Sequence, residues 1–145
     1  MRAGTLLTIL VPFLVMAWPV SAETNKPPEA KAAARGAKSY EKYCLKCHGE
    51  RGVGESVAPW AKNYSPAPAL DHSMHSWHHT DEALLKTILK GTGPKGRMPG
   101  WEKTLTTEQA QDLVAYIKSL WGAWELSCQG PRHMACMHGG QRPKK

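Results

Sequence analysis

The sequence is notable first for the patterns that it lacks. No segment of useful length alternates polar and apolar residues as a half-buried β-strand would, and no internal repeat is present. No cysteine precedes Cys44, which argues against a lipoprotein anchored through an N-terminal cysteine. No paired nucleophile and general base is apparent, so nothing points to acid–base or covalent catalysis. These absences favour a small all-α protein that is not a hydrolytic enzyme.

The length and composition are those of one globular domain. The chain has 145 residues, of which 41% are hydrophobic, and its 19 basic and 12 acidic residues give a formal net charge of +7. The basic residues Lys46, Lys62, Lys95 and Lys103 lie close in sequence to the segments that carry the motifs described below. They suit either an ordinary solvated surface or the electrostatic steering of an acidic partner.

The N-terminal segment resembles a targeting signal in its pattern. Arg2 is followed by an apolar run from Leu6 to Trp18 and then by the small residues Val20-Ser21-Ala22. We therefore predict a secretory signal over 1–22, cleaved after Ala22, and export to the periplasm. The apolar run is shorter than the roughly 20 residues that span a bilayer, but an uncleaved membrane anchor is the alternative.

At least three helices are expected in the remaining chain. The first begins at Ala30 and runs towards Tyr40, after a flexible leader over 23–29. A second is predicted over Asp81–Lys90 with Thr80 as its N-cap, and a third over Thr107–Trp121 behind a Thr106 to Gln109 capping box. The predicted division is a domain over 30–123 and a Cys/Met/His-rich extension over 124–145.

The motif Cys44-Leu45-Lys46-Cys47-His48 carries most of the chemical information. Cysteines three apart on a helix face the same side, so both sulfurs can form thioethers with one edge of a haem while His48 binds its iron. A redox-active cysteine pair would need a strand–helix pattern that is absent, and a zinc site would need a second ligand pair, which only Cys128 and Cys136 could supply. The motif therefore predicts one covalently attached haem c per chain.

The second axial ligand is predicted to be Met98. It lies in "GRMPGW", a loop of glycine and proline that is too polar to be a core segment. A thioether ligand favours ferrous iron and raises the reduction potential relative to two histidines. Competing ligands lie in the segment "DHSMHSWHH"; they are His72, Met74, His75, His78 and His79.

In these features the chain resembles the class I monohaem cytochromes c of bacteria. The resemblance rests on the helix with Gly36 and Tyr40, the Cys44 to His48 attachment motif, the Met98-Pro99 loop and the final "VAYIKSLW" helix. It implies three to five helices wrapped around the haem, with the first helix crossing the last near Gly36 and Tyr116. His48 would be the proximal ligand and Met98 the distal one.

Three functions remain open at this point. With both faces of the haem closed, the chain suits single-electron transfer between redox partners, which include acidic or membrane-bound oxidases and reductases. A small haem peroxidase is the second interpretation and would require an iron without a firmly bound Met98. Nucleic-acid binding is not expected of an exported haem protein, despite the positive charge.

The C-terminal tail supports the third interpretation, a copper-handling redox module. Cys128 and Cys136 enclose a short loop, and in an oxidising compartment we expect a disulfide between them, worth roughly 2.5 kcal/mol by loop entropy. The same stretch is rich in soft donors, which suit Cu(I). The candidate copper ligands are His133, Met134, Cys136, Met137 and His138.

Overall fold

All regular secondary structure is helical in the part of the chain that the computed structural model describes, residues 27–56 and 64–139. Its elements are α1 (Ala30–Tyr43), α2 (Leu45–His48), η1 (Glu50–Gly52), η2 (Ser76–His78), α3 (Asp81–Lys90), α4 (Thr107–Ser119), α5 (Ala123–Ser127), η3 (Gly130–Arg132) and α6 (His133–Gly139). The expected all-α class is confirmed. The predicted signal segment and Lys62 lie outside the described residues, within which no helix is long and apolar enough to cross a membrane.

Local capping explains where the main helices begin. The side chain of Glu29 accepts hydrogen bonds from the backbone N–H groups of Lys31 and Ala32 and so starts α1. Thr80 caps α3 through the N–H of Ala83, as predicted. Both bonds of the predicted capping box at α4 are also present, between Thr106 and Gln109.

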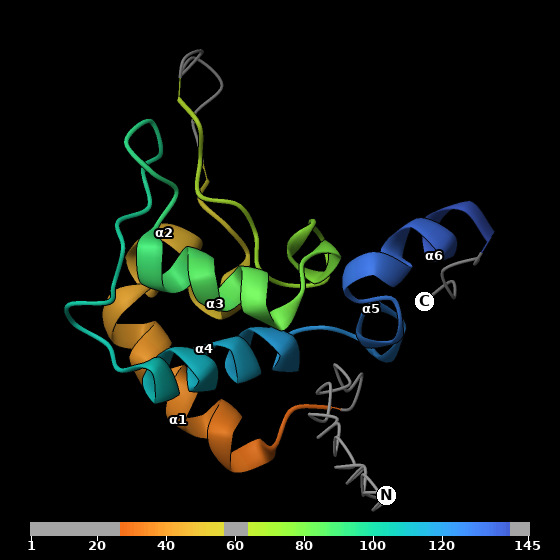
Figure 1. The fold of residues 1–145 in the computed structure, drawn as a ribbon, viewed down its shortest axis with the longest axis horizontal. Coiled ribbons are helices and arrows are strands. Elements are labelled where there is room, and N and C mark those ends of the chain that lie inside the picture. The colour runs from red at the N-terminus through yellow and green to blue at the C-terminus, as the bar shows by residue number, and fades with distance from the viewer. Residues whose placement is uncertain (1–26, 57–63, 140–145) are drawn as a thin grey trace, which may run out of the picture.

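Helices α1 and α4 cross at the base of the molecule and form its most extensive helix–helix contact among the described elements (Figure 1). The crossing depends on Gly36, because a Cβ atom there would lie 1.9 Å from the carbonyl oxygen of Asp112 and 2.9 Å from Cβ of Tyr116. Beside it, the Arg35 guanidinium donates two hydrogen bonds of 2.7 Å to the Asp112 carboxylate. The predicted crossing near Gly36 and Tyr116 is therefore observed.

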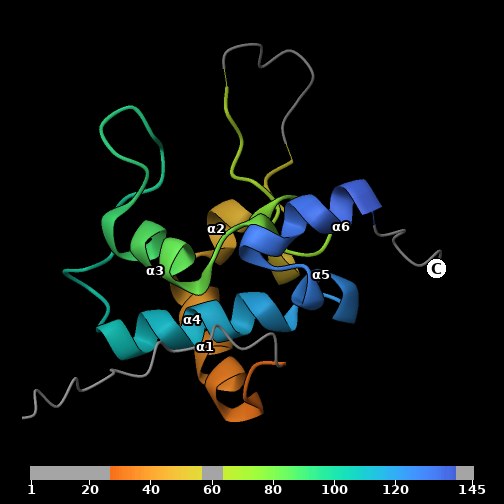
Figure 2. The same cartoon turned by 45° about the vertical axis from the view of Figure 1, so that its right-hand side comes forward.

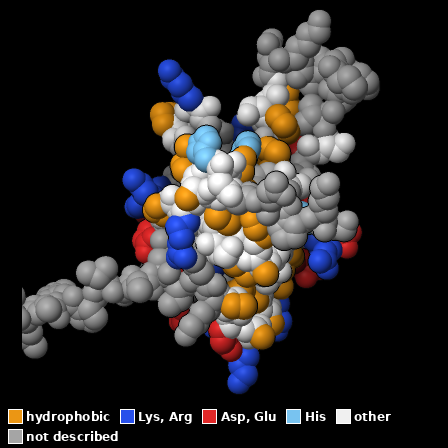
Figure 3. Space-filling view, turned by 90° about the vertical axis from the view of Figure 1, so that its right-hand side faces the viewer, with side chains coloured by type: hydrophobic (Ala, Val, Ile, Leu, Met, Phe, Trp, Pro, Cys, Tyr) orange, Lys and Arg blue, Asp and Glu red, His pale blue; other side chains and the backbone are white. Residues whose placement is uncertain are grey.

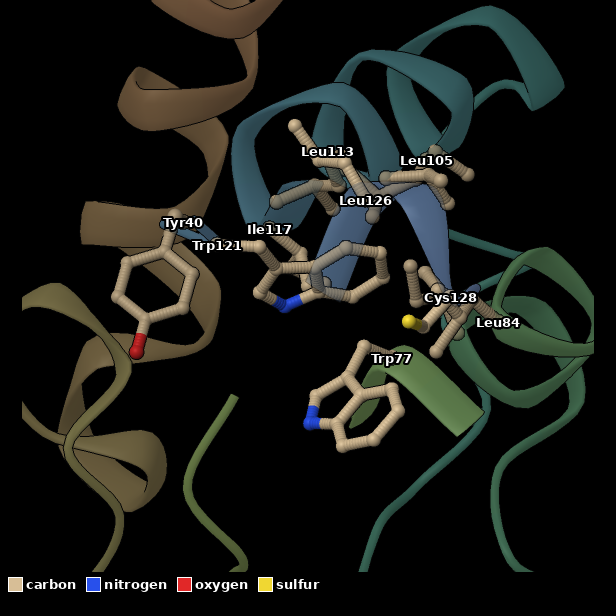
Figure 4. Packing of buried hydrophobic residues seen from close by; sticks show 12 residues of the cluster. Tyr40, Trp77, Leu84, Leu105, Leu113, Ile117, Trp121, Leu126 and Cys128 are labelled. Carbon is tan, nitrogen blue, oxygen red and sulfur yellow. The ribbon is translucent and has the colours of Figure 1, made fainter. Parts of the chain in front are cut away.

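The hydrophobic core fills the space between α4 and the elements that lie over it. Side chains of α4 meet those of α1, α3 and η2, and Figure 4 shows how they converge; the buried members include Tyr40, Trp77, Leu84, Ile88, Leu105, Leu113, Ile117 and Trp121. Trp121 also donates from Nε1 to the carbonyl of Leu70 at 2.9 Å, which ties the segment before η2 to the end of α4. Four residues of this core also line the cavity described in the next subsection; they are Leu84, Ile88, Leu113 and Ile117.

The chain beyond Trp121 adds short helices that the sequence pattern did not predict. Helix α5 begins where the backbone N–H of Gly122 donates to the Glu125 carboxylate at 3.0 Å. Leu126 and Cys128 are buried in the same core as α4, and Cys128 is joined to Cys136 by a disulfide with a Cα–Cα distance of 5.9 Å. Helices this short are marginal alone, so packing and the cross-link hold them rather than intrinsic propensity.

A buried polar cluster joins the tail to α3 and α4. Lys118, whose side chain is 6% exposed, donates to both carboxylate oxygens of Asp81 at 2.9 and 2.7 Å. Gln129, also buried, donates from Nε2 to the same carboxylate at 2.6 Å and to the carbonyl of His79 at 3.1 Å. Asp81 therefore compensates a buried ammonium group and anchors the tail.

We expect the substitution Asp81→Asn to destabilise the protein by about 1–3 kcal/mol, because it leaves the Lys118 ammonium buried without its counter-charge. The Asp81 side chain is 38% exposed, which keeps the expected loss below that of a fully buried pair. Chemical denaturation would measure the loss. Adding Lys118→Met to Asp81→Asn is expected to restore part of it, whereas Glu102→Gln, at a surface pair with Lys90, is expected to change little.

Candidate haem site

The attachment segment sits at the junction of α1 and α2. Cys44 lies between the two helices, and Cys47 lies within α2, one residue before His48. Neither cysteine is in a disulfide, so both thiols are chemically available. Burial, and secondarily the neighbouring Cys47, raises the pKa of the Cys44 thiol to about 11. The segment therefore presents two free sulfurs from one short stretch of chain.

His48 is held in a single orientation. Its side chain is buried, and its Nδ1 lies 2.9 Å from the carbonyl oxygen of Pro68. A carbonyl only accepts, so this bond fixes the proton on Nδ1 and leaves Nε2 with a lone pair that can bind a metal. The turn after His48 is fixed as well, because the Tyr40 hydroxyl donates to the carbonyl of Gly49 at 2.7 Å.

These residues open onto a cavity of about 480 Å³. The segment around Ala67 lines one side and the loop before Met98 lines the other, and both loops project on the same side of α3 in Figures 1 and 2. Leu84, Ile88 and Leu113 supply an apolar floor. Of the candidate ligands, the cavity is lined by Cys44, Cys47, His48, Met74, His75, His79 and Met98, but not by His72 or His78.

The loop that carries Met98 is folded back on the end of α3. The backbone N–H of Thr92 donates to the carbonyl of Met98 at 3.1 Å, and the N–H of Met98 donates to the Thr92 hydroxyl at 3.3 Å. Gly91 permits this approach, because its φ is +72° and a Cβ there would lie 2.5 Å from the Met98 carbonyl oxygen. Met98 is thus presented to the cavity by backbone contacts rather than by a helix.

The sequence did not reveal the contact that ties this loop to the opposite wall. Arg97, which precedes Met98, donates from its guanidinium to the Glu55 carboxylate at 2.9 Å and to the carbonyl of Ser65 at 2.7 Å. It also lies over the Tyr64 ring, 4.0 Å from the ring centroid, and the Tyr64 hydroxyl donates to Glu55. An arginine next to the candidate ligand is the local signal for this bridge between two segments that line the cavity.

We expect the substitution Glu55→Gln to loosen the Met98 loop. Arg97, then Tyr64 and a backbone N–H, lower the pKa of the Glu55 carboxyl to about 2. The charged contact is therefore complete above the ordinary value of 4.5 and is lost only as the pH falls towards 2. At pH 7, Glu55→Gln is expected to bind exogenous imidazole several-fold more tightly than the wild type, as measured by haem absorption. Equal affinity would show that the bridge does not restrain Met98.

The five candidate copper ligands of the tail do not form one site. Cys136 is in the disulfide and has no thiolate, while Met134 and Met137 are largely exposed. His133 bonds through Nδ1 to the Gly130 carbonyl at 2.6 Å, and His138 lies exposed on α6. Among residues 27–56 and 64–139, no three His, Cys, Asp or Glu side chains are arranged to hold a metal ion.

The cavity and its donors fit a covalently held haem. Its volume lies within the usual range for cofactor pockets, about 300–1,000 Å³. Two free thiols and one imidazole with a fixed tautomer lie at one wall, and thioether and imidazole groups lie among the other lining residues. No thiolate quartet or carboxylate cluster competes for a different metal among the described residues.

Comparison with known proteins agrees with this fit. Residues 31–117 match the family model described as cytochrome c oxidase, cbb3-type, subunit III. The chain is 31% identical over 90 residues to the cbb3-type cytochrome c oxidase subunit FixP of Bradyrhizobium diazoefficiens. The aligned residues make up 62% of this chain and 28% of that protein. It is 28% identical over 120 residues to a subunit of nicotinate dehydrogenase from Pseudomonas putida, covering 77% of this chain and 10% of that one.

A third relative is the quinohemoprotein alcohol dehydrogenase ADH-IIG of Pseudomonas putida, with 29% identity over 99 residues, 66% of this chain and 12% of the relative. This chain therefore spans less than a third of the length of each of these relatives. The family match covers the helices and loops that surround the cavity and ends at residue 117, before α5. The chain belongs to the family of cbb3-type cytochrome c oxidase subunit III, whose cytochrome c domain implies a covalently bound haem c.

Proposed function

We propose that this chain is an exported monohaem cytochrome c that carries single electrons between redox partners, with His48 and Met98 as the axial ligands of its haem. The observation that carries the proposal is the fixed His48 imidazole, whose Nδ1 bond to Pro68 leaves Nε2 for the iron. Cys44 and Cys47 would form the two thioether bonds. When bound, the haem supplies reversible one-electron chemistry.

The residues around the cavity favour a closed, rigid site. The Thr92 contacts and the Arg97 bridge hold the Met98 loop on both sides, so the same thioether is offered in both oxidation states. Leu84, Ile88 and Leu113 exclude water from the floor, which limits reorganisation when an electron arrives or leaves. This arrangement supports electron transfer better than substrate turnover.

The partners that suit this function are larger redox complexes. FixP is named as an oxidase subunit and the other relatives as dehydrogenases, so we propose that this chain exchanges electrons with a membrane-bound oxidase or a dehydrogenase. Lys46, Lys95 and Lys103 are exposed, and Lys95 lines the cavity itself. They would steer an acidic partner surface towards the haem, and the rate is then expected to fall as salt is raised.

The substitution Met98→Ala tests the ligand assignment. Haem is expected to stay covalently attached, because the attachment residues are untouched, but the iron should bind added cyanide or imidazole and its potential should fall. Absorption spectroscopy and redox titration measure both effects. The matched control is Met74→Ala, since Met74 also lines the cavity but lies on the histidine-rich segment.

The same pair of variants separates the alternatives. If Met98→Ala leaves the spectrum and the potential unchanged, the ligand is not Met98, and a changed spectrum in Met74→Ala would identify Met74 instead. A high-spin ferric spectrum in the wild-type protein would contradict the electron carrier and support a peroxidase-like enzyme.

A further inference from the structure

A second cavity, of about 330 Å³, lies between the histidine-rich segment and the disulfide-bonded tail. Histidine side chains reach the surface beside hydrophobic ones on this face of the molecule (Figure 3). Met74 and His75 line both this cavity and the haem pocket, so the two spaces are neighbours. Met137 of α6 lines the cavity from the other side, some sixty residues further along the chain. Only the fold brings these donors together.

Neighbouring imidazole rings line this cavity, which is bordered by His72, His75 and His78. The rings of His75 and His78 have centroids 4.9 Å apart, and His78 stacks on His133 at 4.5 Å with an interplanar angle of 14°. The Nε2 atom of His78 is buried and has no hydrogen-bond partner among the described residues. Burial, and then the neighbouring histidines, lower the pKa of His78. A buried nitrogen without a partner calls for an explanation, and a bound ion would supply one.

The chemistry of the lining selects the kind of ligand. The residues that line the cavity include two thioethers, Met74 and Met137, and no Asp or Glu. Cys136 also lines it, but the disulfide removes its thiolate. Imidazole binds both Zn²⁺ and copper, so the two thioethers and the absence of carboxylates are what favour a soft monovalent ion over Zn²⁺ and harder cations.

The spacing is compatible with one shared ion. Two nitrogens bound to the same metal lie at most about 4 Å apart, twice a usual metal–nitrogen distance. Rings whose centroids are 4.9 Å apart can place two nitrogens within that limit. Met74 and Met137 are 41% and 59% exposed, so their flexible side chains can close over an ion without disturbing the core.

We infer that this cavity binds one Cu(I) ion through His75, His78, Met74 and Met137. The site differs from a chelate built within the tail alone, because it uses no thiolate and draws three of its donors from the segment before α3. It lies beside the haem pocket and does not depend on electron transfer by the haem. Copper binding therefore goes beyond the proposed function and is tested without it.

The test is anaerobic equilibrium dialysis of the holoprotein, with its haem iron reduced and its disulfide intact, against Cu(I) held by a competing chelator. The copper bound to the retained protein is then measured by metal analysis. One copper per chain is expected for the wild type. Met137→Leu is expected to weaken copper binding at least about tenfold. Losing a residue that only orients a metal ligand already lowers metal affinity by about that factor, and Met137 is a proposed ligand itself. His78→Phe, which keeps an aromatic ring in the stack, is expected to weaken it similarly.

One control variant and one optical measurement decide the outcome. Met134→Leu changes an equally exposed methionine of α6 that does not line the cavity, and it is expected to bind copper as the wild type does. Equal weakening in Met134→Leu and Met137→Leu would overturn the inference, as would wild-type affinity in Met137→Leu. A change in the haem spectrum on adding Cu(I) would place the ion at the haem ligands and would overturn it too.

Discussion

The substitution His48→Ala is expected to prevent the accumulation of holoprotein. His48 is buried, bonded to Pro68 and part of the wall of a cavity of about 480 Å³. The free energy of unfolding of such a domain is only about 5–15 kcal/mol. A large pocket that lacks its anchored cofactor would therefore remove much of this stability. We expect the yield of covalently loaded protein to fall roughly tenfold or more, because cofactor binding and folding are coupled.

Haem staining of denatured protein together with pulse proteolysis of cell extracts measures this yield and the folded fraction. His138→Ala is the control, because it removes an exposed imidazole of α6. Holoprotein from His48→Ala with wild-type yield and spectrum would contradict the role of His48.

The substitution Gly36→Ala is expected to destabilise the protein by about 3 kcal/mol, the upper end of the usual range for overpacking. The added Cβ would lie 1.9 Å from the Asp112 carbonyl oxygen, which belongs to the backbone of α4 and has no rotamer to change. Relief would require α1 and α4 to move apart. That movement would also disturb the Tyr40 and Tyr116 rings, whose centroids are 4.9 Å apart.

Denaturant midpoints of the holoprotein measure this effect. Gly139→Ala is the matched control, since nothing lies within 4 Å of a Cβ at that position of α6. Arg35→Ala next to Gly36 is expected to cost less, because the Arg35 side chain is 54% exposed and its pair with Asp112 is screened by solvent. A midpoint for Gly36→Ala equal to that of Gly139→Ala would show that the helix crossing is not tight.

The helices of the body could be predicted because their signals are local. Thr80 bonds three residues ahead, and Thr106 and Gln109 bond each other, so the caps of α3 and α4 depend on residues within one turn. The predicted bounds of α3 agree with the structure, whereas α4 ends at Ser119, two residues before the predicted end. Helix ends depend on how the following chain packs, which a local pattern does not contain.

The choice of the distal haem ligand, unlike the helices, depends on tertiary contacts. Met74, His75, His79 and Met98 all line the haem pocket, and the sequence favoured Met98 only by the character of its loop and by family resemblance. The fold distinguishes Met98 by the contacts of its loop, with Thr92 on one side and Arg97 reaching Glu55 on the other. Met98 as the distal ligand remains a prediction, now with a physical reason for its presentation.

The cofactor could be read from the chain alone, because the predicted attachment residues Cys44, Cys47 and His48 lie within about one turn of helix and need no distant partner. The course of the tail could not, since it depends on tertiary contacts. Trp124 meets Trp77 edge-on at 5.2 Å, and Gln129 bonds to His79 and Asp81. These contacts join residues some fifty positions apart. Burial that depends on such distant partners produces no hydrophobic periodicity in the local sequence from which it could be predicted.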